Sequence, residues 1–348
     1  MIQKVSSFLK KDTVLTIALA LAVLSMFIIP PSAGYLGYLD LHTLILLFGL
    51  MTATTGLQNI GFFRQLGELL LLRIYSLRQL EQLLILLCFF SSMLITNDVA
   101  LITFVPFALE LLRMVNRKDR IVPVVICQTL AANLGSMTTP VGNPQNLYLY
   151  STFGLSAGTL IRYMLPLTVF SALLLVIAVF LLKNRPLSID RTAMDETILP
   201  ERSSLIFYLA LFLVCLGCVV RIYSWHVMFL VVLAAVLVKD RTLFFRVDYF
   251  LLLTFVCFFV FIGNMERIPA VSSLLTRLIS GREFAAGVLL SQCISNVPAA
   301  ILLSGFTSAV RPLLYGVNVG GLGTLIASLA SVISYRAYSE VPGAKTGK

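Results

Sequence analysis

The chain has 348 residues, of which 59% are hydrophobic and 12% are charged, and its mean hydropathy is +0.96. Average soluble domains carry about 25% charged residues, so this composition excludes a water-soluble globule and predicts an all-α polytopic membrane protein. The formal net charge is +10, but the Lys and Arg residues form short clusters between apolar runs. Such clusters are typical of cytoplasmic loops, and they argue against a nucleic-acid partner.

Apolar runs long enough to cross a bilayer, about 20 residues each, alternate with these basic clusters. We predict spans over residues 13–31, 41–57, 160–182, 205–220, 225–238 and 249–262. Lys4, Lys10 and Lys11 precede the first span, so the N-terminus is expected to be cytoplasmic. Residues 60–78 and 266–282 mix charged and apolar side chains and are predicted to lie along the membrane surface. We expect a multi-pass protein of the cell (plasma) membrane with both termini cytoplasmic.

The triplet Thr96-Asn97-Asp98 lies in the middle of an apolar run, where polar groups are costly. The apolar arms beside it, about 14 residues each, reach roughly 21 Å, which is too short for a crossing. Basic residues flank the pair of arms on both ends, so both flanks should be cytoplasmic. We therefore predict a re-entrant hairpin near residues 79–114, entered from the cytoplasm. The alternative is two full spans joined by a buried polar kink, which breaks the charge rule.

The next predicted helix, over residues 121–153, is interrupted by two Gly, two Pro and three Asn within residues 133–146. Regular helix cannot continue through such a run. Irregular backbone at membrane depth is tolerated only where it is buried in protein or lines a cavity. We therefore predict a broken helix at a binding site.

The second half of the chain repeats this order of elements. Short arms near residues 283–306, entered from outside, have Ser295-Asn296-Val297-Pro298 at their tip, and a helix over residues 311–336 is broken at 318–323. Inverted repeats with broken helices are typical of secondary transporters. We divide the chain into a first repeat (1–182), a cytoplasmic linker (183–203) and a second repeat (204–348). In the second repeat no segment corresponds to the span 160–182.

Each tip and each break begins a new half-helix, whose N-terminus carries roughly +0.5 charge and free N–H donors. Four such ends meeting at the midplane would bind an anion without any Arg, and Asn oxygens with loop carbonyls can hold Na⁺. The predicted substrate- and ion-binding residues are Thr96, Asn97, Asp98, Asn133, Gly135, Ser136, Thr139, Pro140, Gly142, Asn143, Ser295, Asn296, Val297, Pro298, Asn318, Gly320, Gly323 and Thr324. The Na⁺ ligands among them are Asn97, Asp98, Asn133, Asn296 and Asn318.

Asp98 is the one acid that the sequence predicts at full membrane depth. Hydrocarbon favours the neutral carboxyl group, so Asp98 can bind and release a proton or hold a cation during transport. The alternative is that Asp98 only caps the second arm through its N–H groups. Val297 stands in the corresponding place of the second tip, so this charge is one-sided.

Other polar and thiol groups point to no catalytic chemistry. The sequence has no Walker loop, no His-Glu-x-x-His and no nucleophile elbow, so we expect neither an enzyme nor a cofactor. All six cysteines lie in apolar segments and are expected to be reduced. His42 and His226 are expected to anchor helix ends at the interface, while Gln128 and Gln292 either face the site or pack between helices.

Thr96-Asn97-Asp98 and Ser295-Asn296-Val297 resemble the paired Ser-Asn-Thr signatures of the ion transporter superfamily. That superfamily includes the divalent anion–sodium symporters, the citrate transporters and the arsenite permeases. The resemblance implies a homodimer whose transport domain moves like an elevator, with Asn97 and Asn296 as ligands of substrate and coupling ion. Asp98 stands where the sodium–dicarboxylate branch has Thr, and an Asn-Asp tip is closer to the arsenite permease and antiporter branches.

The sequence therefore predicts a secondary active transporter of small anions, coupled to Na⁺ or H⁺, with di- or tricarboxylates such as citrate or succinate as substrates. The alternative on the same fold is a Na⁺/H⁺ antiporter or an arsenite exporter. A membrane scaffold or receptor that transports nothing is an alternative of another class, and two symmetric hairpins argue against a channel. The expected partners are the anion, membrane lipids and a second copy of the chain.

Overall fold

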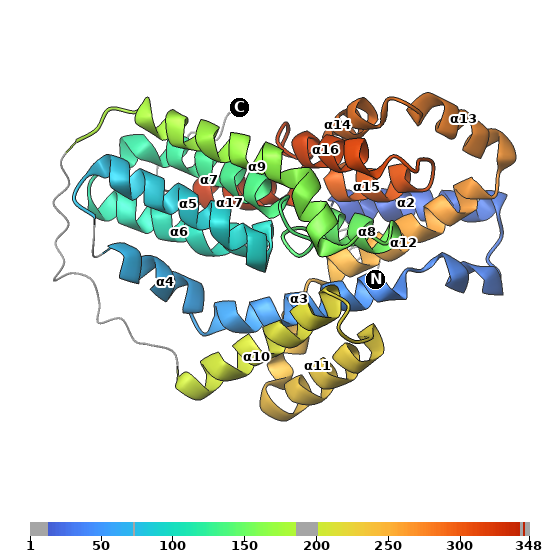
Figure 1. Ribbon diagram of the computed structural model, residues 1–348, viewed down its shortest axis with the longest axis horizontal. Helices are drawn as coiled ribbons and strands as arrows, with labels where there is room; N and C mark the ends of the chain where they lie inside the picture. The colour runs from blue at the N-terminus through green and yellow to red at the C-terminus, as the bar shows by residue number, and fades with distance from the viewer. Residues whose placement is uncertain (1–12, 72–73, 186–200, 342–343, 345–348) are drawn as a thin grey trace. The chain divides into compact units, whose positions relative to one another are not determined.

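The computed structural model describes residues 13–71, 74–185, 201–341 and 344, and these residues form helices and connecting segments with no strand. Figure 1 shows the helices in chain order. Up to the start of the linker they are α2 (Thr13–Ile28), η1 (Ala33–Tyr38), α3 (Leu41–Asn59), α4 (Phe62–Leu71), α5 (Leu77–Ile95), α6 (Asn97–Met114), η2 (Lys118–Arg120), α7 (Ile121–Ser136), α8 (Pro144–Thr152) and α9 (Ala157–Phe180). The basic N-terminal segment and most of the predicted linker lie outside the described residues.

The second half is also helical throughout its described part. Its helices are α10 (Arg202–Val219), α11 (Trp225–Lys239), η4 (Arg241–Phe245), α12 (Tyr249–Glu266), α13 (Pro269–Ile279), α14 (Glu283–Ile294), α15 (Asn296–Ser304), α16 (Val310–Gly320) and α17 (Leu329–Ser339). The last helix begins at Leu329, five residues later than predicted, whereas α8 begins at Pro144, three residues earlier than the predicted restart at 147.

Five described helices are long and apolar enough to cross a membrane by length and composition: α3, α5, α9, α10 and α12. Their surfaces carry large apolar side chains that no other described helix covers. On α9, for example, Phe170 and Leu173 are each 57% exposed. An apolar surface of this extent is stable in contact with lipid hydrocarbon rather than water. The chain is therefore an all-α, multi-pass membrane protein.

The helices form two compact units, and the boundary between them falls within α3 after Met51. Unit 1 comprises α2, η1, the start of α3, α8 and the helices from α11 to α16. Unit 2 comprises the rest of α3, the helices from α4 to α7, then α9, α10 and α17. Each unit thus contains one helical hairpin and the helix that follows it. Unit 2 also contains α17, the last part of the broken helix that begins with α16, and unit 1 contains α8, the last part of the broken helix that begins with α7. In unit 2 α17 packs on α6 and α7, and in unit 1 α8 packs on α15 and α16.

Helix α5, the first arm of the hairpin of unit 2, is longer than the apolar arm that the sequence predicts. Helix α5 has 19 residues and α6 has 18, so each is about 27–28 Å long at 1.5 Å per residue. The predicted arm of about 14 residues is wrong for α5, which begins at Leu77 behind a capping box made by Ser76 and Gln79. By contrast α14 has 12 residues and α15 has 9, about 18 and 14 Å.

Charged side chains in the first turns of α5 have partners inside unit 2. Glu81 and Arg120 are buried together with an N–O distance of 3.5 Å. Arg78 donates to the carbonyls of Phe180 and Leu182 at the end of α9. From the local sequence alone these residues are predicted to be surface charges, because their partners lie far away along the chain.

Glycines set the close approach of helices beside both breaks. A Cβ on Gly135 of α7 would lie 2.0 Å from the Phe89 carbonyl oxygen on α5. In unit 1 a Cβ on Gly316 of α16 would lie 2.5 Å from the Phe284 carbonyl oxygen on α14. Neither position has room for a side chain, so both contacts are made backbone to backbone.

Candidate functional site

The two hairpin tips have the same unusual backbone. Thr96, between α5 and α6, has φ 74° and ψ 148°, and Ser295, between α14 and α15, has φ 77° and ψ 154°. Non-glycine residues rarely adopt positive φ, and such strain persists only where the surroundings impose it. In both tips a single residue joins two helices that pack against each other, so one residue makes the whole reversal.

The residue after each strained position is tied to the loop that breaks a neighbouring helix. The Asn97 N–H donates to the Gly142 carbonyl at 3.0 Å, and the Asn296 N–H donates to the Ala327 carbonyl at 2.9 Å. Gly142 and Ala327 each lie two residues before the helix that resumes after the break. Each unit therefore contains one assembly of a tip and a loop, which we call the first break (unit 2) and the second break (unit 1).

Side chains at the first break form a buried amide network. The Asn97 Nδ2 donates to Asn133 Oδ1 at 3.1 Å, and both residues are buried. The Asn97 Oδ1 accepts from the Asp98 N–H at 3.0 Å. Asn133 in turn donates to the Thr129 carbonyl within α7. The structure thus brings three of the predicted residues together, with Asp98 half-buried in the first turn of α6.

The loop of residues 137–143 closes over this network. Thr139 donates its hydroxyl to the Met93 carbonyl of α5 and accepts from the Gly142 N–H. Asn143 donates to Ser136 Oγ at 3.1 Å, and Ser136 donates to the Asn133 carbonyl. These hydroxyls and amides are all within the set that the sequence predicts.

Other predicted residues at the first break contribute shape rather than polar groups. A Cβ on Gly142 would lie 2.1 Å from the Ser136 carbonyl oxygen, so only glycine fits there. Gly135 faces the α5 backbone, as described above, and Pro140 is buried in the loop.

The second break is organised around Gln292. The sequence leaves open whether this residue faces the binding site or packs between helices. Its side chain donates to the Gly320 carbonyl and accepts from the Thr324 N–H at 2.9 Å. A Cβ on Gly323 would lie 2.1 Å from Gln292 Oε1, and one on Gly321 would lie 2.7 Å from Asn296 Nδ2. Glycines therefore allow the loop to pass directly over two amide side chains.

Asn318 links the second break to the start of α8. Its Nδ2 donates to Asn146 Oδ1 at 2.8 Å and to the Leu314 carbonyl at 2.8 Å. Gln145 Nε2 donates to Asn318 Oδ1 at 3.4 Å. Gln145 and Asn146 are buried and are absent from the predicted set, although their position directly after the break, among apolar residues, was a signal available in the sequence.

The tip residues of the second break differ in character from those of the first. Ser295 Oγ lies 3.5 Å from both Asn296 Oδ1 and the Ala327 carbonyl oxygen. Val297 and Pro298 are buried apolar residues. Pro298 is the third residue of α15, where its missing N–H leaves no helical bond unmade.

The N-terminal N–H groups of α6 and α15 are not all free, which corrects the expectation from sequence. The N–H groups of Asn97, Asp98 and Asn296 donate to acceptors within the chain. An incoming anion would therefore meet side-chain amides and hydroxyls together with the positive ends of the helix dipoles. Within the described residues no three His, Cys, Asp or Glu side chains are grouped to hold a metal ion.

A hairpin, a helix break and apolar outer helices in one chain are features of membrane transporters. The sequence matches the citrate transporter family over residues 2–334, and the chain belongs to that family. This confirms the resemblance to the ion transporter superfamily.

Individual relatives agree with the family. The chain is 37% identical over 256 residues to an uncharacterized transporter of Methanocaldococcus jannaschii, covering 73% of this chain and 69% of the relative. It is 32% identical over 321 residues to the inner membrane protein YbiR of Escherichia coli, covering 90% and 84%. It is 38% identical over 111 residues to the silicon efflux transporter LSI3 of Oryza sativa subsp. japonica, covering 32% and 22%.

Proposed function

We propose that the protein is a secondary active transporter that moves small anions, di- or tricarboxylates such as citrate or succinate, coupled to Na⁺ or H⁺. The observation that carries this proposal is the pair of matching breaks, each with a strained tip residue whose following N–H binds a loop carbonyl. Membership of the citrate transporter family supports the carboxylate class. The activity proposed is transport, without a catalytic step or an organic cofactor.

We assign the ligands of substrate and ion to the side chains at the two breaks. At the first break, Asn97, Ser136 and Asn143 offer amide and hydroxyl donors to carboxylate oxygens. Coupling Na⁺ would take oxygens from Asn97, Asp98 and Asn133, since hard cations prefer oxygen ligands. At the second break the corresponding oxygens come from Asn296 and Asn318.

The proposed membrane topology is an inverted repeat with two re-entrant hairpins. Length supports this only for α14 and α15, because α5 and α6 are long enough to cross a bilayer. For the first hairpin the support is charge: Arg78 precedes it, and Arg113 with Arg117 follows it. The same charge rule underlies the proposed cytoplasmic termini and a location in the cell membrane.

A homodimer with elevator-type movement is proposed from the family resemblance alone. The apolar faces of helices such as α9 and α10 would then contact lipids or the second copy. Crosslinking of the purified protein in lipid nanodiscs tests the dimer directly, and a single band at the monomer mass would contradict it.

Uptake of radiolabelled citrate and succinate into proteoliposomes, with an imposed Na⁺ or pH gradient, tests the proposed function. We expect gradient-dependent uptake that is lost in Asn97→Ala and in Asn296→Ala. Asn59→Ala, an exposed position at the end of α3, is the matched control and should keep full uptake. Absence of carboxylate uptake under every gradient would reject the carboxylate assignment.

A second candidate function is export by a Na⁺/H⁺ antiporter or arsenite exporter on the same fold. Two observations favour it: the acid at the first tip, Asp98, and the similarity of one segment to a silicon efflux transporter. Arsenite accumulation or Na⁺-dependent proton movement in everted membrane vesicles measures this activity. Either signal without carboxylate uptake would replace the first proposal by the second.

A further inference from the structure

A cavity of about 520 Å³ lies within unit 1. It is lined by residues of η1, by Asp40 and the first turn of α3, by the second half of α8, by the last turns of α12 and by one residue of α15. Ligand sites commonly have volumes of about 300–1,000 Å³. None of the residues assigned to substrate or coupling ion lines this cavity.

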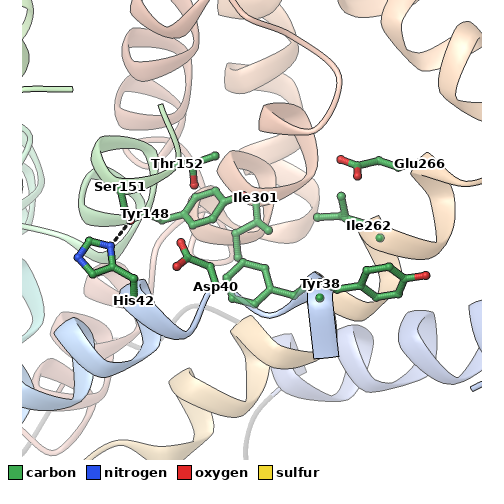
Figure 2. A pocket seen from close by; sticks show the side chains of 12 residues that line it. Tyr38, Asp40, His42, Tyr148, Ser151, Thr152, Ile262, Glu266 and Ile301 are labelled. Atoms are coloured by element: carbon green, nitrogen blue, oxygen red, sulfur yellow. Dashed lines mark hydrogen bonds between the residues drawn. The ribbon is translucent and has the colours of Figure 1, made fainter. Parts of the chain in front are cut away.

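Two acidic side chains line the cavity, one at each of two sides. Figure 2 shows Asp40 and His42 on one side and Glu266 on the opposite side, with its carboxylate directed inward. The twelve lining residues include no Lys or Arg. Within the described part of the chain neither Asp40 nor Glu266 forms an ion pair. The cavity therefore presents two separated carboxyl groups.

The Asp40 carboxylate is held in place and retains acceptor capacity. Asp40 accepts from the Thr43 N–H and hydroxyl, which fixes it at the start of α3. A carboxylate has about four lone-pair sites, so two remain. Glu266 projects over Gly305, where a Cβ would lie 2.4 Å from its Oε1. Glycine at position 305 thus leaves the space that the carboxylate occupies.

Part of the cavity lining is apolar and includes Phe259, Ile262 and Ile301. Figure 2 shows Ile301 between Asp40 and Glu266, with the ring of Tyr148 beside it. The rings of Tyr148 and Phe259 are 5.7 Å apart, and the Tyr148 hydroxyl is hydrogen-bonded to Ser304 at 2.8 Å. An apolar strip between two anionic groups matches a ligand with two cationic ends and a hydrocarbon middle.

Other ligand classes fit less well. The described residues contain no group of three His, Cys, Asp or Glu that could hold a metal ion. An anion would face two carboxylates with neither Lys nor Arg in the lining, and the one basic side chain there, His42, is already hydrogen-bonded to Ser151. Ammonium groups, in contrast, gain charge-assisted hydrogen bonds from carboxylates and attraction from aromatic faces.

We propose that this cavity binds a small aliphatic diamine. One ammonium group binds Asp40, the other binds Glu266, and the methylene chain packs on Phe259, Ile262 and Ile301. The site shares no residue with those assigned to the transported substrate, so the diamine is proposed as an additional ligand and not as that substrate.

Isothermal titration of the purified full-length protein in detergent with 1,4-diaminobutane tests this proposal. We expect saturable binding at one site per chain, about tenfold weaker binding of 1-aminobutane, and none of 1,4-butanediol, because each ammonium–carboxylate pair contributes roughly one order of magnitude. Diamines of different chain length should show one optimum, set by the separation of the two acids.

Three variants locate the site. Glu266→Gln and Asp40→Asn should each weaken diamine binding about tenfold; Asn also caps helices well, so α3 is preserved. Gly305→Ala keeps both charges but displaces the Glu266 carboxylate, and it should also weaken binding. Glu110→Gln, an exposed acid on α6, is the matched control and should leave affinity unchanged.

Equal binding of diol and diamine, equal binding of monoamine and diamine, or unchanged affinity in both acid variants would overturn the proposal. An equal loss in Glu110→Gln would do the same, since it would show non-specific charge attraction. The measurement needs no gradient and no transport. Asn97→Ala should keep its diamine affinity, so a failure of the transport proposal remains distinguishable from a failure of this one.

Discussion

Asn97 donates its backbone N–H to the carbonyl of Gly142, and this bond joins the tip of the α5–α6 hairpin to the loop that ends α7. Asn296 and Ala327 make the same connection at the second break. A tip and its loop are therefore one structural element in each unit. Changes to either member should affect the other, and the first predictions use this dependence.

Gly142→Ala should abolish uptake and destabilise the protein. The added Cβ would lie 2.1 Å from the Ser136 carbonyl oxygen, so the loop must move and the bond to Asn97 is lost. Overpacking of this kind costs about 1–3 kcal/mol. Thermal unfolding in detergent and proteoliposome uptake measure both effects. Gly34→Ala, whose Cβ would meet nothing closer than 3.4 Å, is the control, and equal behaviour of the two variants would contradict the role of the loop.

Asn97 and Asn133 should behave as a coupled pair. Because their side chains are bonded to each other at 3.1 Å, the double variant Asn97→Ala/Asn133→Ala should lose less substrate affinity than the sum of the two single variants. Coupling between contacting residues is about 0.5–3 kcal/mol. Citrate binding by the purified variants measures it. The pair Asn133→Ala and Asn59→Ala should be additive, and additivity in the first pair would show that the bond does not matter for binding.

Asp98→Asn should remove the pH dependence of uptake if proton coupling passes through the first break. The amide keeps the size and hydrogen-bonding shape of the side chain but cannot take up a proton. Uptake at a series of pH values, with Na⁺ held constant, measures the effect. Asp119→Asn, an exposed acid beside Arg117, should keep the wild-type profile. An unchanged profile in Asp98→Asn would assign Asp98 to helix capping alone.

Glu81→Leu should strongly destabilise the protein, because it removes the buried acid that pairs with Arg120 and leaves only the exposed Asp119 beside it. Breaking a buried pair on one side costs about 3–5 kcal/mol, whereas replacing both partners by apolar residues is often neutral. The double variant Glu81→Leu/Arg120→Met should therefore recover much of the lost stability. Arg120 also donates to the Lys183 carbonyl at 2.6 Å, so that recovery is expected to be incomplete. Full loss in the double variant would show that this last bond is the more important one.

Helix content and the positions of both breaks follow from the sequence, because each depends on residues that are close together along the chain. Long apolar runs predict α3, α9 and α12 to within a few residues. Clustered Gly, Pro and Asn predict the interruption after α7. The assignment of individual ligands stays a prediction.

The remaining features depend on contacts that no sequence window contains. The start of α5 is misjudged because Glu81 is neutralised by Arg120, a distant residue. The late start of α17 reflects the carbonyl of Ala327, which remains outside the helix to accept the Asn296 N–H. Gln145 and Asn146 are missed because Asn318, their partner, lies in the other half of the chain. In each case the sequence names the residues but does not reveal which of them are paired in the fold.

The position of α8 in unit 1 and of α17 in unit 2 also affects how the protein folds during its synthesis. The α5–α6 hairpin and α7 emerge early during synthesis, yet α17, which packs on α6 and α7, is the last helix described. Contacts of such wide sequence separation form late and slow folding. Unit 2 therefore cannot complete its packing until Leu329–Ser339 has been synthesised. Until then the surfaces of α6 and α7 that α17 covers can make other contacts.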